Sequence, residues 1–88
     1  MRVIEITNLS RKDVPIYYRR LYSGIVVLEL INKKIMAVPL DFQIEQKPTG
    51  HVEISTTLME DVDYPLGPLK KELKRFIVSL DSDGKLPR

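Results

Sequence analysis

The stretch that decides the fold is GIVVLELINKKIMAVPLDFQIEQKPTGHVEISTTL, residues 24–58. It begins with an apolar run, residues 25–31, that is rich in β-branched residues and too short for a typical buried helix. Apolar and polar residues then alternate over residues 36–45 and again over residues 52–58. A period of two is typical of strands with one buried face, so we predict three antiparallel strands here.

Two tight turns are predicted to connect these strands. Asn32 and Lys33 interrupt the apolar residues, and Asn tolerates the positive φ of a two-residue hairpin turn. Pro48 suits the first central position of a type I turn, and Gly50 can adopt the left-handed conformation that follows. Pro39 lacks the N–H that an interior ladder uses, so we expect a bulge or a sheet edge there.

A C-terminal helix is predicted from one apolar stripe. Large apolar residues recur at helical spacing, at Leu66, Leu69, Leu73, Phe76, Ile77 and Leu80. Pro68 suits the first turn of this helix and Gly84 suits its C-terminal cap. The stripe is expected to pack on the sheet face that carries Phe42 and Ile54. The predicted fold class is α+β, with a four- or five-stranded, mainly antiparallel meander sheet and one C-terminal helix on one face.

The N-terminal part is less regular. Residues 2–7 alternate and predict a first strand, and residues 8–13 are polar and predict a loop. Residues 14–23 leave two alternatives. Pro15 and Gly24 suit the start and the end of a helix, whereas the tyrosines favour a strand or an extended loop, which we prefer.

Length and composition bound the class of protein. The chain has 88 residues, 43% of them apolar and 30% charged, and this predicts one ordinary folded domain over residues 1–84 with a flexible tail at 85–88. It has no cysteine, which suits a reducing compartment. No apolar run has the length of a signal-peptide core or a membrane span. We therefore expect a cytoplasmic protein.

The net charge of +2 conceals three blocks of opposite sign. Residues 1–34 carry +4, residues 35–66 carry −5 and residues 67–88 carry +3. This layout is compatible with an acidic partner on the basic ends, or with attraction between two copies of the chain.

The residues that most often carry catalysis are sparse. The single histidine, His51, follows a predicted turn and is expected to be solvated. Glu60, Asp61 and Asp63 lack the spacing of a calcium loop, so we interpret them as a solvated connector. Glu45 and Glu53 are expected on an open sheet face, where a carboxyl group is unsuited to acid–base work. We predict no catalytic activity, no metal and no cofactor.

Two functions remain after these exclusions. The first is a non-catalytic interaction or regulatory module that can form a homodimer, because the first hairpin is apolar on both faces. One face is expected to carry Ile25 and Val27. The other face is expected to be the self-association surface, with the residues Val26, Leu28, Leu30 and Ile35.

The second function is a nucleic-acid-binding module for single-stranded DNA or RNA. Aromatic residues alternate with arginines in one segment, and a cationic face is predicted on the C-terminal helix. The candidate residues are Tyr17, Tyr18, Arg19, Arg20, Tyr22, Lys70, Lys71, Lys74 and Arg75. The expected partners are therefore a protein, a second copy of the chain or a nucleic acid, and not a membrane.

Overall fold

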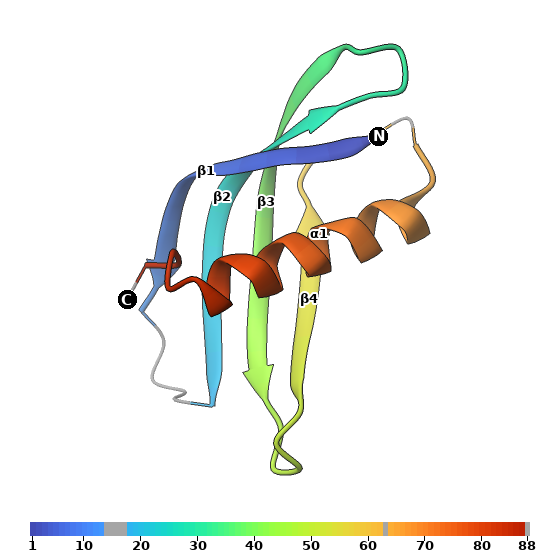
Figure 1. The fold of residues 1–88 in the computed structure, drawn as a ribbon. Helices are drawn as coiled ribbons and strands as arrows, with labels where there is room; N and C mark the ends of the chain where they lie inside the picture. Colours follow the sequence, from blue (N-terminus) through green and yellow to red (C-terminus); the bar gives the residue numbers. More distant parts are fainter. Residues whose placement is uncertain (14–17, 63, 88) are drawn as a thin grey trace.

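The computed structural model describes residues 1–13, 18–62 and 64–87. Four strands form one antiparallel sheet in the order of the sequence, and one helix follows them. The elements are β1 (Arg2–Lys12), β2 (Arg19–Glu29), β3 (Ile35–Gln46), β4 (Val52–Leu58) and α1 (Leu66–Ser82) (Figure 1). The predicted α+β class, with a four-stranded meander and a C-terminal helix, is confirmed.

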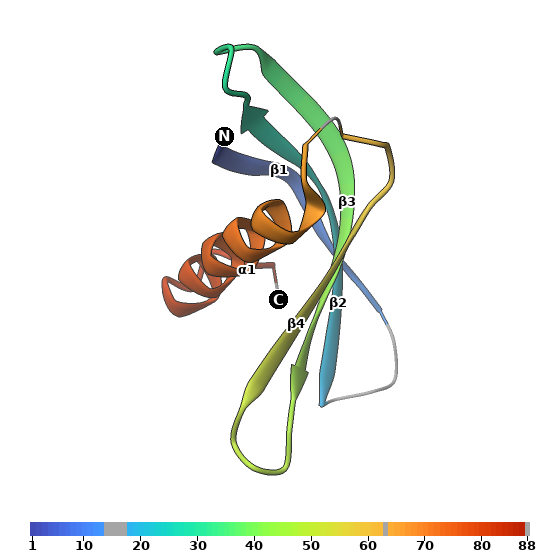
Figure 2. The ribbon, with the colours of Figure 1, turned by 90° about the vertical axis from the view of Figure 1, so that its right-hand side faces the viewer.

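The helix α1 packs on one face of the sheet only. Figure 2 shows the sheet as one curved layer with α1 on a single side. We call the face beneath α1 the inner face and the opposite one the outer face. Leu69, Leu73 and Ile77 of α1 are fully buried, and so are Val26 and Val38 of the sheet, which oppose each other in the register of β2 and β3. The hydrophobic core therefore lies between α1 and the inner face.

The register between β2 and β3 differs from the predicted one by a single residue. The loop is longer than a two-residue turn, because the last pair of the ladder is Glu29 with Ile35. The Lys33 N–H donates to the Leu30 carbonyl over 2.9 Å, and Lys33 has a φ of 64°. A one-residue change in register moves every side chain of a strand to the opposite face relative to its partners. The two sides of this hairpin therefore carry different residues from those we predicted.

The strand β1 continues through the segment that was predicted as a loop. Ser10 and Lys12 pair with Ser23 and Leu21 of β2, after an irregularity at residues 7–10 where Asn8 has a φ of 52°. A second irregularity lies between residues 3 and 5. Bulges bend a strand and increase its twist, and this lets β1 cross the top of the sheet and then turn along β2 (Figure 1). Polar composition alone did not reveal this bent strand.

Other local predictions agree with the structure. Gly50 has a φ of 89° in the turn between β3 and β4, and Phe42 opposes Thr56 as expected. Pro39 lies where β4 has ended, so its missing N–H breaks no ladder bond, and its carbonyl accepts from the Met59 N–H over 3.0 Å. Residues 19–23 are extended, in agreement with the preferred alternative, while residues 14–17 lie outside the described part of the chain.

The C-terminal end of the chain is more ordered than expected. Gly84 has a φ of 68° just beyond α1, which agrees with its predicted role as a cap. Leu86 then packs into the core with 8% of its surface exposed, so the predicted flexible tail contributes a buried side chain. Within the described residues, no helix has both the length and the apolar character needed to cross a membrane.

Candidate interaction surface

The outer face carries an exposed group of apolar side chains near the β2–β3 hairpin. Ile25 and Val27 of β2 oppose Pro39 and Ala37 of β3, and Ile35 follows at the end of the ladder. Ala37, Pro39 and Ile35 are exposed, the last with 59% of its surface accessible. We call these five residues the apolar patch. No described element covers them, because α1 occupies the inner face (Figure 2).

The apolar patch replaces the surface that the sequence indicated. Val26 and Leu28 were predicted to take part in self-association, but both are 0% exposed beneath α1. Leu30 is half-buried, and only Ile35 of the predicted set is strongly exposed. The physical reason is the register, which pairs Val26 with Val38 on the inner face and leaves Ile25 and Val27 outside.

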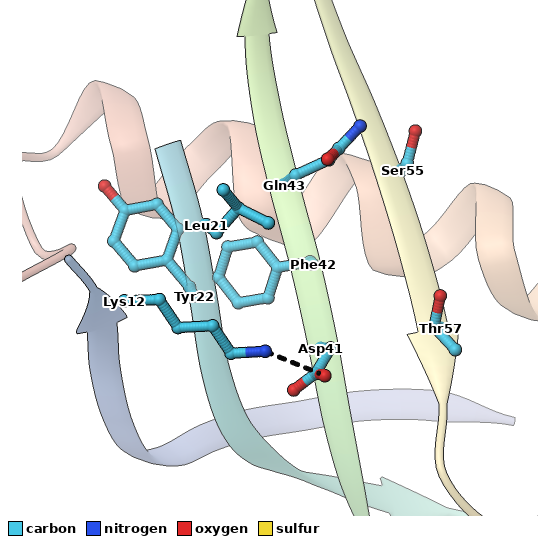
Figure 3. A pocket seen from close by; sticks show the side chains of 8 residues that line it. All are labelled: Lys12, Leu21, Tyr22, Asp41, Phe42, Gln43, Ser55 and Thr57. Carbon is cyan, nitrogen blue, oxygen red and sulfur yellow. Dashed lines mark hydrogen bonds and ion pairs between the residues drawn. The ribbon is translucent and has the colours of Figure 1, made fainter. Parts of the chain in front are cut away.

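Toward the other end of β2 and β3, the outer face becomes polar. Lys12 and Asp41 lie at the edge of an open hollow of about 360 Å³ whose further lining includes Leu21, Gln43 and Ser55. Figure 3 shows the Lys12 side chain reaching from β1 over β2 toward Asp41 on β3. This half of the outer face presents hydrogen-bonding groups and one apolar side chain, and the charges described there lie in pairs.

The charged side chains of the outer face are paired with one another. The Lys12 Nζ lies 3.1 Å from an Asp41 carboxylate oxygen, and Ser23 donates to the second Asp41 oxygen over 3.0 Å. Lys12 first, and then Ser23, hold the pKa of Asp41 below its ordinary value. In the same way Lys47, and then Arg19, lower the pKa of Glu45, with contacts of 3.1 and 3.2 Å. These carboxylates are therefore stabilised in their ionised form.

The Lys12–Asp41 pair predicts a small acid sensitivity. Because the pKa of Asp41 is lower in the folded chain than in the unfolded one, the pair stabilises the fold above about pH 4, the usual range for an aspartate. This contribution is lost as the pH falls through the lowered pKa. We expect the melting temperature of Lys12→Met to fall less steeply with acid than that of the parent. Both partners are more than a third exposed, so screening keeps the difference small.

Thermal melts across the acid range check this expectation. Lys34→Met is a suitable control, because Lys34 is exposed and forms no ion pair with any residue that the structure describes. Its acid profile should match that of the parent. Identical profiles for Lys12→Met and the parent would contradict a stabilising role for the pair.

The predicted tyrosine and arginine segment is largely engaged within the fold. Arg20 contacts both carboxylate oxygens of Asp81, at the end of α1, over 3.0 and 3.2 Å, and its NH1 donates to the Tyr22 hydroxyl over 3.2 Å. Tyr22 is 1% exposed and stacks on Phe42 with the ring centroids 5.1 Å apart. Asp81 raises the pKa of Arg20. Arg20 and Tyr22 thus attach the end of α1 to β2 and do not offer a platform to bases.

The neighbouring residues of that segment point elsewhere. Arg19 lies on the opposite face from Arg20, since consecutive strand residues alternate, and it pairs with Glu45 over 3.2 Å. Its guanidinium carbon lies 5.8 Å from the centroid of the exposed Tyr18 ring. Tyr17 lies outside the described residues. The structure therefore divides the predicted segment between the two faces of the sheet.

The predicted basic helix residues are present and exposed. They are Lys70, Lys71, Lys74 and Arg75, and all four are accessible to solvent. They are separate from Arg20, which joins the opposite end of α1 at Asp81. The nine predicted nucleic-acid contacts therefore do not form one surface, and only the four on α1 are grouped together.

The remaining polar candidates are isolated. His51 is exposed in the β3–β4 turn, where its carbonyl accepts from the Lys47 N–H over 2.8 Å. Glu60 and Asp61 are exposed, and Asp63 lies outside the described residues. The described part of the chain holds no cluster of three or more acidic, histidine or cysteine side chains arranged to bind a metal.

The comparisons with known proteins give one match. The model of the protein family labelled BB_0187 matches residues 1–82. The chain belongs to this family. No curated protein and no solved structure matches it.

The family match covers the complete folding unit. The matched range includes all four strands and reaches Ser82, the last residue of α1, so the family pattern spans the sheet and the helix together. In this member of the family, the apolar patch and the basic residues of α1 are the two surfaces that contacts among the described residues leave accessible. They lie on opposite sides of the sheet (Figure 2).

Proposed function

We propose that this protein is a small non-catalytic interaction module that associates with a second copy of itself through the apolar patch. The observation that carries this proposal is the uncovered position of the patch. Ile25 and Val27 lie at its centre, and Ile35 presents more than half of its surface to solvent. Contiguous exposed apolar side chains of this kind mark interaction sites on soluble domains.

The charges around the apolar patch favour a second copy as the partner. Arg2 pairs with Glu29 at 3.7 Å on one side of the patch, and Lys12 pairs with Asp41 at 3.1 Å beyond the other. A two-fold interface places one patch against its own copy, so a face with charge of one sign would repel itself. Here each side carries one cation and one anion. Two copies can therefore meet without an excess of like charge.

The electrostatics of the outer face also support a role without catalysis. Asp41 and Glu45 lie there with lowered pKa values, so each is ionised at neutral pH and unsuited to donate a proton. A general acid needs a carboxyl group whose pKa is raised toward the working pH. The carboxylates of this face instead hold neighbouring strands together through ion pairs.

The proposal predicts that Val27→Glu prevents self-association. The substitution places a charge at the centre of the apolar patch, where burial between two copies would leave it unpaired. Sedimentation of the parent over a range of concentrations should show a dimer that dissociates on dilution. Val27→Glu should remain monomeric at concentrations where the parent is dimeric.

A matched control separates this effect from a general change in surface charge. Val52 is exposed on β4 outside the apolar patch, and Val52→Glu adds the same charge there. This variant should dimerise as the parent does. A parent that stays monomeric at every concentration, or equal weakening by both variants, would rule out the proposed surface.

A further inference from the structure

The solvent-facing side of α1 carries a concentration of positive charge. Lys71, Lys74 and Arg75 are exposed there, while Leu69 and Leu73 point into the core. Lys70 is also exposed, but it borders a hollow of about 200 Å³ together with the acidic residues Glu60 and Asp61. Lys71, Lys74 and Arg75 therefore form the part of the helix that is most open to an anion. We call these three residues the basic helix face.

The basic helix face repels itself. Lys71 and Arg75 are four residues apart and Lys71 and Lys74 are three apart, so like charges are neighbours on the helix surface. Such pairs destabilise a helix. Only Arg75 has an ion pair within the described residues, with Glu72 at 3.9 Å. The pairs within the fold thus leave most of this charge without a counterion.

The other charges of α1 also oppose the helix dipole. The first turn contains no acidic residue and the last turn no basic one, whereas Asp81 and Asp83 stand at the C-terminal end. A helix is stabilised by the opposite arrangement, with anions at its start and cations at its end. Arg20 offsets Asp81 by pairing with it over 3.0 Å. No described residue offsets the positive charge in the N-terminal half in the same way.

We propose that the basic helix face binds the phosphate backbone of a nucleic acid. A phosphate backbone supplies the closely spaced negative charges that Lys71, Lys74 and Arg75 lack within the fold. The outer face of the sheet is a poor alternative for phosphate, because its cations already pair with Asp41, Glu45 and Glu53. The contact is electrostatic and independent of base sequence.

A nucleic acid fits this surface better than a lipid bilayer does. Amphipathic helices bind membranes by inserting an apolar face between the headgroups. The apolar stripe of α1 is already buried, with Leu69, Leu73 and Ile77 in the core. On the described helix only Leu66 and Val78 are exposed large apolar residues. A bilayer would therefore meet charge without an inserted apolar anchor.

This inference goes beyond the proposed self-association and does not depend on it. The basic helix face and the apolar patch lie on opposite sides of the sheet (Figure 2). Val27→Glu should therefore bind nucleic acid through each monomer, with the same salt dependence as the parent. Failure of self-association and failure of nucleic-acid binding are thus separate results.

The experiment compares two triple variants that remove the same charges from different places. The test variant is Lys71→Gln, Lys74→Gln, Arg75→Gln. The control variant removes two lysines and one arginine that are exposed away from α1, with the substitutions Arg11→Gln, Lys34→Gln and Lys85→Gln. Both variants lower the net charge equally. Without ligand, the test variant should melt at the same temperature as the parent or higher, since it loses like-charge pairs.

Fluorescence anisotropy measures binding to labelled strands about 20 nucleotides long, which exceeds the site sizes of small single-strand binders. Single-stranded and duplex probes are titrated between about 50 and 200 mM salt. The parent and the control should bind at least one probe and weaken steeply with salt. The test variant should lose roughly tenfold or more in affinity, with a slope of log K against log salt smaller by about 2, because three phosphate contacts are lost.

Three results would overturn the proposal. The first is no binding of the parent to either probe at the lowest salt concentration. The second is an equal loss in the test and control variants, which would assign the effect to net charge alone. The third is binding to polyglutamate, or to vesicles containing phosphatidylserine, that is as tight as binding to nucleic acid and equally dependent on Lys71, Lys74 and Arg75.

Discussion

Replacing Leu73 by alanine is expected to destabilise the fold by about 2–5 kcal/mol, the usual cost of removing a buried leucine. Leu73 is 0% exposed at the centre of α1, between the flanking buried residues Leu69 and Ile77. Its truncation loses apolar burial and leaves a cavity, because the strands beneath the helix cannot fully collapse. Domains of this size are stable by only about 5–15 kcal/mol, so the loss is a large share of the total.

Chemical denaturation followed by circular dichroism measures this effect. Val78→Ala is the matched control, because Val78 is in the same helix with half of its surface exposed. Alanine is a better helix former than valine, so the control should unfold at the same denaturant concentration or a slightly higher one. A Leu73→Ala variant as stable as the parent would show that α1 does not seal the inner face.

Gly24→Val is expected to be the second strongly destabilising change. A Cβ atom at Gly24 would lie 3.0 Å from the Ile6 side chain, 3.1 Å from the Thr7 carbonyl oxygen and 3.2 Å from the Leu9 side chain. Valine adds two further methyl groups to this crowded place. Because the backbone of β1 passes so close, part of that strand must move, and we expect a cost of about 1–3 kcal/mol or more.

The chain offers a control glycine with open space around it. A Cβ at Gly67, in the first turn of α1, meets no atom within 4 Å. Gly67→Ala should leave stability unchanged or raise it by about 0.4–1 kcal/mol, since alanine restricts the unfolded chain. If Gly24→Val unfolds at the same temperature as the parent, then β1 does not bend over β2 as closely as the structure indicates.

The architecture followed from the sequence because the hydrophobic pattern was strong and local. Alternation over residues 36–45 and 52–58 predicted β3 and β4, and the stripe through Leu69 and Leu73 predicted α1. Each pattern selects one periodicity, so backbone and burial agree. The bent course of β1 was different, because a positive φ at Asn8 and two pairing irregularities have no clear signature in a polar segment.

The candidate surface was harder to predict because it depends on register. A loop one residue longer than the expected turn pairs Val26 with Val38, and this exchanges the buried and exposed residues of the hairpin. Exposed Lys71 and Lys74 were predictable from helical spacing alone. The engagement of Arg20 with Asp81 joins residues 61 positions apart, and no local pattern indicates such a contact.

The central claim is that α1 covers one face of the sheet and that a second copy covers the apolar patch on the other. The most direct test is a search for intermolecular nuclear Overhauser effects in a mixed sample of labelled and unlabelled protein. We expect contacts between copies from the methyl groups of Ile25, Val27 and Ala37, and none from the buried methyl groups of Leu69 or Leu73. Intermolecular contacts confined to residues outside the apolar patch, or their complete absence at concentrations suited to the measurement, would contradict the account.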